Sequence, residues 1–156
     1  MDFSEYVAAR RTSLVRSAVL LGCRLPEAED VVQTTLLKCF RSWARVQQAS
    51  NPEAYVYTAL VNTVRDARQR RWHGEVPTVE LPETGAEPDL SRPIAVRRAM
   101  AGLSHEHREV LVLRFYADLS EREVCDALGL PPSTVKSRTA RAKQALSTLL
   151  EAEDAH

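Results

Sequence analysis

Apolar residues recur every three or four positions through most of the chain, which is the spacing of a helix with one buried face. The first such run ends at Gly22, and its apolar stripe consists of Phe3, Val7, Leu14, Ala18 and Leu21. A second run begins near Pro26, a residue suited to a first helical turn, and its stripe consists of Val32, Leu36, Phe40 and Trp43. The pattern predicts two amphipathic helices at the start of the chain.

A third helix is predicted to begin at Asn51 and Pro52, a capping residue followed by a first-turn proline. Its inward positions are Val56, Leu60 and Val64. The opposite face is polar and ends in an arginine-rich segment, with Asn62, Arg65, Asp66 and Gln69 at steps of three or four. This face is either a solvated surface or a binding surface, and the spacing alone leaves both interpretations open.

The segment from residue 72 to residue 93 interrupts the helical pattern. It contains Pro77, Pro82, Pro88, Pro93, Gly74 and Gly85. Proline lacks an amide donor and fixes φ, so neither helix nor sheet is expected to run through this stretch. We predict an acidic, flexible linker with one domain on each side; in a second interpretation, Trp72 and Val79 pack it onto one domain.

Helical spacing resumes at Ile94 and continues to about Leu103, where Ser104 caps a further helix reaching Tyr116. A Ser-x-x-Glu capping box at Ser120 and Glu123 then opens a helix that runs to Leu128.

Gly129 supplies a tight turn, and Pro131, Pro132 and Ser133 start a last helix reaching about Glu151. Cys125 is small where the two helices would cross, and Val135 is apolar where they would lock together. The segment has the spacing of a helix-turn-helix.

The second helix of such a motif enters the major groove of DNA with its first residues. Here these are short hydroxyl groups and long donors, namely Ser133, Thr134, Lys136, Ser137, Arg138 and Arg141. The hydroxyls can reach phosphate together with the helix's own amides, and the longer side chains can reach base edges or backbone. The alternative is an ordinary helical hairpin with a basic solvent face.

Charge is distributed unevenly although the formal net charge is zero. Residues 1–71 carry 11 basic and 7 acidic side chains, residues 72–93 carry 1 and 5, and residues 94–156 carry 9 and 9. Binding of phosphates needs a local excess of Lys and Arg, and such clusters occur at residues 65–71 and 136–143. Neutrality is therefore an average over unlike segments.

The sequence contains no motif that would indicate a disulfide-bonded protein, a metalloprotein or an enzyme. Cys23, Cys39 and Cys125 are odd in number and far apart, and His105 and His107 have no further ligand at metal-binding spacing. No nucleophile elbow or phosphate-binding glycine loop occurs, so we expect no enzyme, cofactor or metal site. Without a membrane span or a signal peptide, a cytoplasmic protein is expected.

Three motifs resemble those of a known family. They are Ala28-Glu29-Asp30-Val31-Val32-Gln33, Leu60-Val61-Asn62-Thr63, and Gly129 followed by Ser133-Thr134-Val135-Lys136-Ser137-Arg138. Together they resemble the extracytoplasmic-function (ECF) sigma factors of the sigma-70 family. The segment from Arg70 to Thr78 is similar to the actinobacterial SigE-like branch.

The resemblance implies an all-α protein with a sigma-2 domain at residues 1–71, a linker at 72–93 and a sigma-4 domain at 94–150, without a sigma-3 domain. Asp30, Gln33 and Thr34 match the helix that grips the clamp helices of the largest polymerase subunit, although the family often has Glu in place of Thr34. The sigma-4 domain would contact the polymerase flap.

The implied DNA contacts fall in both domains. Residues matching the part that binds the opened minus-10 element are Asn62, Arg65, Arg68, Arg70 and Arg71, and those of the base-capturing loop are Gln47, Gln48 and Ser50. Trp43 and Tyr55 are candidate stacking platforms, with core packing the preferred role for Trp43. Residues Ser133 to Arg141 would read the minus-35 duplex.

The implied partners are core RNA polymerase, promoter DNA and an anti-sigma factor. Only residues 151–156 follow the last predicted helix, so we expect no regulation by an appended domain. The alternative is a stand-alone, dimeric helix-turn-helix regulator whose first helices serve dimerisation or sensing.

Overall fold

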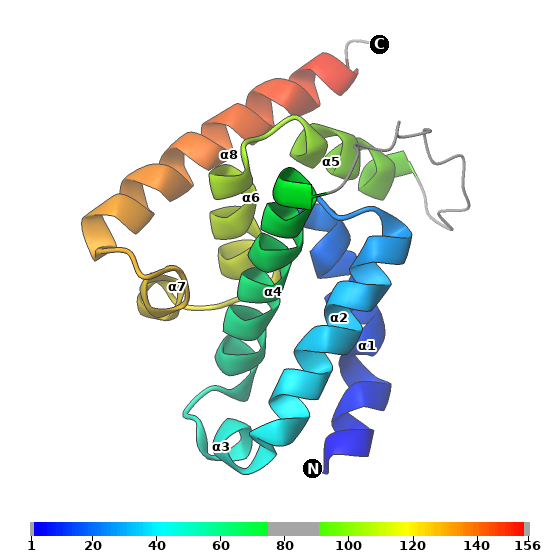
Figure 1. The fold of residues 1–156 in the computed structure, drawn as a ribbon. Coiled ribbons are helices and arrows are strands. Elements are labelled where there is room, and N and C mark those ends of the chain that lie inside the picture. The colour runs from blue at the N-terminus through cyan, green and yellow to red at the C-terminus, as the bar shows by residue number, and fades with distance from the viewer. Residues whose placement is uncertain (1, 75–90, 155–156) are drawn as a thin grey trace.

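The computed structural model describes residues 2–74 and 91–154, and every regular element in these two ranges is a helix (Figure 1). The first bundle comprises α1 (Phe3–Leu20), α2 (Leu25–Arg41), α3 (Trp43–Gln48) and α4 (Pro52–Gly74). The second bundle comprises α5 (Ser91–Ala101), α6 (His105–Leu111), the π-helix η1 (Val112–Tyr116), α7 (Glu121–Leu128) and α8 (Pro132–Asp154). The all-α prediction is confirmed.

The core of the first bundle forms from the predicted stripes. Leu14, Ala18, Leu21, Val32, Leu36, Val56, Leu60 and Val64 are all buried. Capping signals set the helix ends, since Asp2 and Glu5 form a capping box at the start of α1. Gly22 follows α1 with φ at +115°, a conformation that side chains disfavour. Local chemistry and burial therefore agree along this part of the chain.

Two details of the first bundle differ from the predicted pattern. The second predicted helix ends at Arg41, and α3 begins at Trp43 and runs to Gln48, so the implied base-capturing loop is partly helical. Phe40, predicted to face inward, is 57% exposed, although its ring packs against Phe3 with centroids 5.0 Å apart. The prediction was wrong because Phe40 lies in the last turn of α2, where few elements surround it.

The second bundle contains the predicted helix-turn-helix. Ser120 and Glu123 form a reciprocal capping box that opens α7. Gly129 ends α7 with φ at +67°, the left-handed conformation that the turn requires. Cys125 and Val135 are both buried where α7 and α8 cross. The local signals of the sequence and the observed turn agree residue by residue.

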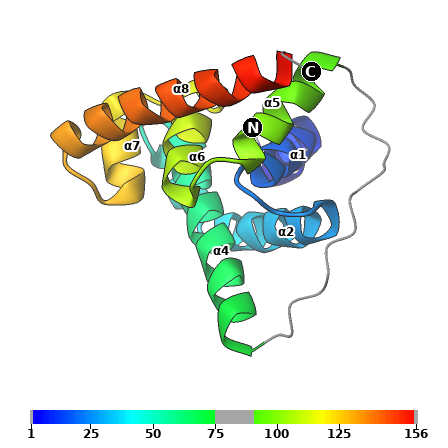
Figure 2. The same cartoon turned by 90° about the horizontal axis from the view of Figure 1, so that it is seen from above.

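The two bundles pack against each other, and their buried residues form one continuous cluster. Helix α4 packs against α2 on one side and against α7 on the other, while α1 contacts α5 and η1 (Figures 1 and 2). Helix α4 continues to Gly74 and α5 begins at Ser91, so helices enter both ends of the predicted linker. The rest of that linker, including Val79, and the side chain of Trp72 lie outside the described residues.

Candidate nucleic-acid and polymerase interface

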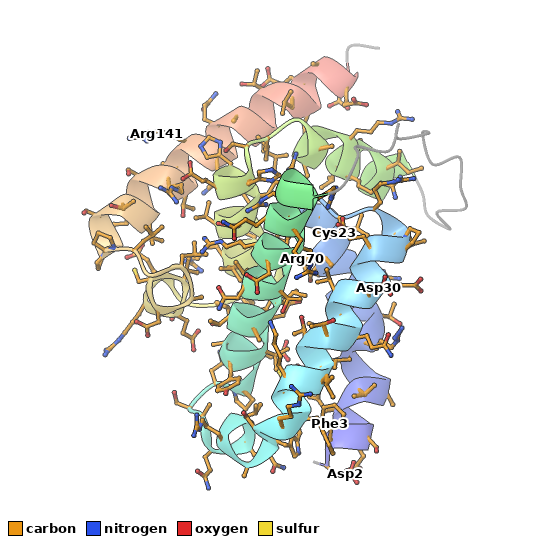
Figure 3. All side chains as sticks on the ribbon, viewed as in Figure 1. Asp2, Phe3, Cys23, Asp30, Arg70 and Arg141 are labelled. Carbon is orange, nitrogen blue, oxygen red and sulfur yellow. The ribbon has the colours of Figure 1, made fainter. Side chains whose placement is uncertain are left out.

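The predicted polymerase contacts share one face of α2. Asp30, Gln33 and Thr34 are all exposed, and buried Val32 and Leu36 occupy the opposite face. Figure 3 labels Asp30 on α2, on the side of that helix away from α4. The amphipathic arrangement of α2 therefore leaves these three polar groups accessible to a partner.

Two exposed apolar residues lie on the same face, and the sequence pattern did not predict their exposure. Leu37 lies four positions after Gln33 and is 49% exposed, and Phe40 follows three positions later. Apolar residues at this spacing usually mark the buried face, so periodicity could not identify them as surface residues. An exposed apolar strip beside polar groups is typical of a protein-binding surface.

The predicted minus-10 residues are brought together only in part. Ser50 and Asn62 line one open cavity of about 500 Å³ with Asn51 and Tyr55. This volume is in the range of small-ligand sites, and Tyr55 supplies an aromatic wall. Gln47 and Gln48 are exposed on α3 and are not among the residues lining the cavity.

Trp43 packs inside the first bundle. Its ring lies 5.4 Å from the rings of Phe3 and Tyr6, between centroids, in edge-on and tilted geometries. This confirms core packing as its role.

The arginines of α4 are largely engaged in ion pairs. Arg65 donates from Nε and Nη2 to the two carboxylate oxygens of Glu109, at 2.9 and 2.8 Å. Arg68 Nη2 lies 3.9 Å from the same carboxylate, and Arg71 pairs with Glu27 of α2. Arg70 is exposed at the surface of α4 (Figure 3). The ridge predicted from sequence thus exists, but part of it is covered by the second bundle.

The first turns of α8 carry the predicted recognition residues on an accessible surface. Ser133, Lys136, Ser137 and Arg141 are exposed, and Thr134 is half-buried. Arg138 is 20% exposed at its side chain, with Nη2 3.6 Å from a carboxylate oxygen of Glu106 on α6. Lys136 Nζ lies 4.0 Å from Glu121 on α7. Spacing along the sequence does not reveal these pairings, because they link different helices.

The cysteines are structural residues in the part of the chain that the structure describes. All three are reduced and buried, and burial raises the pKa of Cys23 to about 12 and that of Cys39 to about 11. Residues 2–74 and 91–154 contain no group of three His, Cys, Asp or Glu side chains placed to hold a metal ion. Within the same ranges, no helix has the length and apolar character needed to cross a membrane.

Family comparisons match the two bundles separately. The family model described as Sigma-70 region 2 matches residues 6–74, and that described as Sigma-70, region 4 matches residues 94–146. The RNA polymerase sigma-E factor of Streptomyces coelicolor is 33% identical, covering 99% of this chain and 89% of that protein. The ECF RNA polymerase sigma factor SigL of Mycobacterium tuberculosis is 31% identical over 88% of this chain and 82% of its own.

The chain belongs to the sigma-70 family, in its extracytoplasmic-function group. It is an alternative sigma factor, a protein that directs transcription initiation by RNA polymerase. The match over both bundles decides against a stand-alone helix-turn-helix regulator.

Solved structures show the same fold. The sigma factor RpoE of Bartonella quintana, in complex with the anti-sigma factor NepR, is 26% identical and covers 96% of this chain and 97% of its own with a TM-score of 0.75. CnrH, in complex with the cytosolic domain of CnrY, gives a TM-score of 0.64 at 24% identity over 96% of this chain and 88% of its own. Superposition of one bundle alone could not give a TM-score of 0.75, so RpoE and this chain place their two bundles similarly.

Proposed function

We propose that this sigma factor binds core RNA polymerase through the exposed face of α2. Asp30, Gln33 and Thr34 supply polar groups there, and Leu37 and Phe40 supply apolar area that the fold leaves uncovered. The observation that carries this assignment is the exposure of two large apolar side chains directly beside the polar positions. The protein acts in the cytoplasm with the polymerase, and it serves as a specificity subunit without catalysis of its own.

The two bundles contact promoter DNA at separate elements. The first bundle, residues 1–71, binds the opened minus-10 strand through Asn62 and the arginines of α4, with an unstacked base held against Ser50 and Tyr55 on the first-bundle side of the cavity. The second, residues 94–150, reads the minus-35 duplex with the start of α8. Residues 72–93 tether them, which raises the effective concentration of one bundle at its element once the other is bound.

Solved structures of similar proteins support regulation by an anti-sigma factor. RpoE and CnrH were both solved with a protein partner, and the RpoE partner is an anti-sigma factor. Because the α2 face is exposed in this chain, a protein covering it would compete directly with polymerase. We expect such a factor to hold this protein inactive.

Substitution of Asp30 and Gln33 by Ala tests the α2 assignment. The double variant should bind core polymerase at least tenfold more weakly in a fluorescence binding assay, because both exposed polar contacts are lost without change to the buried face. A matched control is Glu29→Ala, which is exposed on the same helix but is not one of the assigned contacts. Unchanged affinity of a folded double variant would overturn the assignment.

A further inference from the structure

The most deeply buried acid of the second bundle faces the first bundle. Glu109 lies on α6, is 4% exposed, and accepts both hydrogen bonds from Arg65 of α4. A buried carboxylate is tolerated only when it is paired. Arginine binds carboxylate and phosphate with the same two-pronged geometry. Glu109 therefore binds the Arg65 guanidinium with the geometry that a DNA phosphate would use.

A second acidic contact lies just before the start of α4. Asn51 donates from Nδ2 to a carboxylate oxygen of Glu123 at 2.9 Å. Glu123 and Asp126 of α7 also line the cavity that contains Ser50 and Asn62. Two carboxylates of the second bundle thus face the residues proposed to hold the minus-10 base, and their charge would repel the strand that carries it.

Packing supports the same contact between the bundles. Gly22, at the end of α1, lies so close to Arg108 of α6 that a Cβ placed there would be 2.6 Å from Nη1. The φ of +115° favours glycine at this position, and the approach adds to the α4–α7 packing. The remaining assigned surfaces are accessible, because Asp30 and Gln33 on α2 and Lys136 on α8 are exposed. Within the minus-10 surface the second bundle covers Arg65 and Arg68, whereas Asn62 and Arg70 stay exposed.

The closed arrangement is too short to bind both promoter elements. The centres of the minus-10 and minus-35 elements are roughly 25 base pairs apart, or about 85 Å along duplex DNA. The longest helices, α4 and α8, have 23 residues each and measure about 35 Å. The tether across residues 75–90 can span at most about 60 Å. Promoter binding therefore requires that the bundles separate, and the covalent connection permits it.

We propose that the second bundle inhibits its own chain, with Glu109, Glu123 and Asp126 standing in for DNA phosphates on the minus-10 surface until core polymerase draws the bundles apart. This inference rests on the proposed assignment of α4 to the minus-10 strand. The same placement of the bundles occurs in a sigma factor held by its anti-sigma partner.

The test uses the full chain with Glu109→Gln and Glu123→Gln combined. Both changes preserve shape and remove charge, and Gln at residue 123 still completes the capping box. The control is Glu153→Gln, which breaks the Arg98–Glu153 pair inside the second bundle, 3.6 Å between N and O. Circular dichroism confirms that each variant is folded.

Two properties are measured without polymerase. Small-angle scattering gives the radius of gyration, expected at about 15 Å for the closed wild type and above about 20 Å for the double variant. Fluorescence anisotropy gives the affinity for a pool of random single-stranded 20-mers, expected to rise about tenfold in the double variant and little in the control. Raising NaCl from 0.1 to 1 M shortens the Debye length from about 10 to about 3 Å and should open the wild type without any mutation.

A wild type that is already extended, or a double variant that stays closed and binds no more tightly, overturns the inference. So does an opened variant without increased DNA affinity. A transcription assay with core polymerase distinguishes a wrong self-inhibition proposal from a wrong minus-10 assignment. If Asn62→Ala still lowers initiation while the double variant gains nothing, only self-inhibition is wrong.

Discussion

Arg138→Ala and Glu106→Gln should change minus-35 binding in opposite directions. Arg138 lies at the start of α8 with its guanidinium 3.6 Å from Glu106, and Glu106 is 67% exposed. To contact a base, Arg138 must leave this carboxylate. The carboxylate is therefore a competitor of DNA for the same guanidinium.

The magnitudes follow from the two contacts. A bidentate arginine–base contact contributes about 1–3 kcal/mol. An exposed ion pair such as Arg138–Glu106 contributes about 0.2–1 kcal/mol. Arg138→Ala should thus cost about 1–2 kcal/mol on the matched duplex, or roughly 5- to 30-fold in affinity. Glu106→Gln should improve affinity by up to about fivefold, and this gain should shrink when Arg138 is already Ala.

The assay is fluorescence anisotropy of the full chain on minus-35 duplexes with each base pair varied, at several salt concentrations. Arg141→Ala is the control, because we expect this exposed side chain, further along α8, to contact the DNA backbone. It should weaken binding to every duplex alike and reduce the salt slope by about one. If Arg138→Ala loses affinity equally on all duplexes, it does not read a base. If no variant weakens binding, α8 is not the recognition helix.

Four further outcomes are expected. Asn62→Ala should reduce initiation on a duplex promoter and leave minus-35 binding unchanged; a parallel loss of minus-35 binding would indicate misfolding instead. Ser120→Ala removes the α7 cap and should lower the free energy of unfolding by about 1 kcal/mol in urea denaturation. Hydrogen bonds from Ser120 and Asn51 lower the pKa of Glu123, so its ionised form stabilises the fold above pH of about 4.3 and this contribution is lost as pH falls further. The stability difference between wild type and Glu123→Gln should therefore shrink in acid. Cys23 and Cys39, with raised pKa values, should react with iodoacetamide at pH 8 far more slowly than in the unfolded chain, and rapid labelling would show that the core opens.

The sequence predicted those features that depend on neighbouring residues. The stripe of Val56, Leu60 and Val64 was identified by spacing, and the turn at Gly129 by the need for a left-handed residue. The capping box at Ser120 was also identified, because its two hydrogen bonds join residues three apart. Such signals lie within one turn of helix, where spacing and chemistry are both visible in the sequence.

Features that join distant segments were not predicted. Arg65 and Glu109 are 44 residues apart, and each looks like an ordinary solvated charge on its own helix. Periodicity tells which face of a helix is buried, but not which partner buries it. Phe40 shows the converse error, since helical spacing put it on the inward stripe although no element covers it fully. The polymerase contacts of Asp30, Gln33 and Thr34 on α2 stay a prediction.

The central claim is that this chain directs polymerase to promoters, and one measurement tests it most directly. The protein is reconstituted with core RNA polymerase and genomic DNA, and the 5′ ends of the transcripts are sequenced. We expect start sites that require the protein, share two sequence elements near minus-10 and minus-35, and disappear with Asn62→Ala. Transcription unaffected by the protein, or specific DNA binding by a dimer in the absence of polymerase, would contradict it.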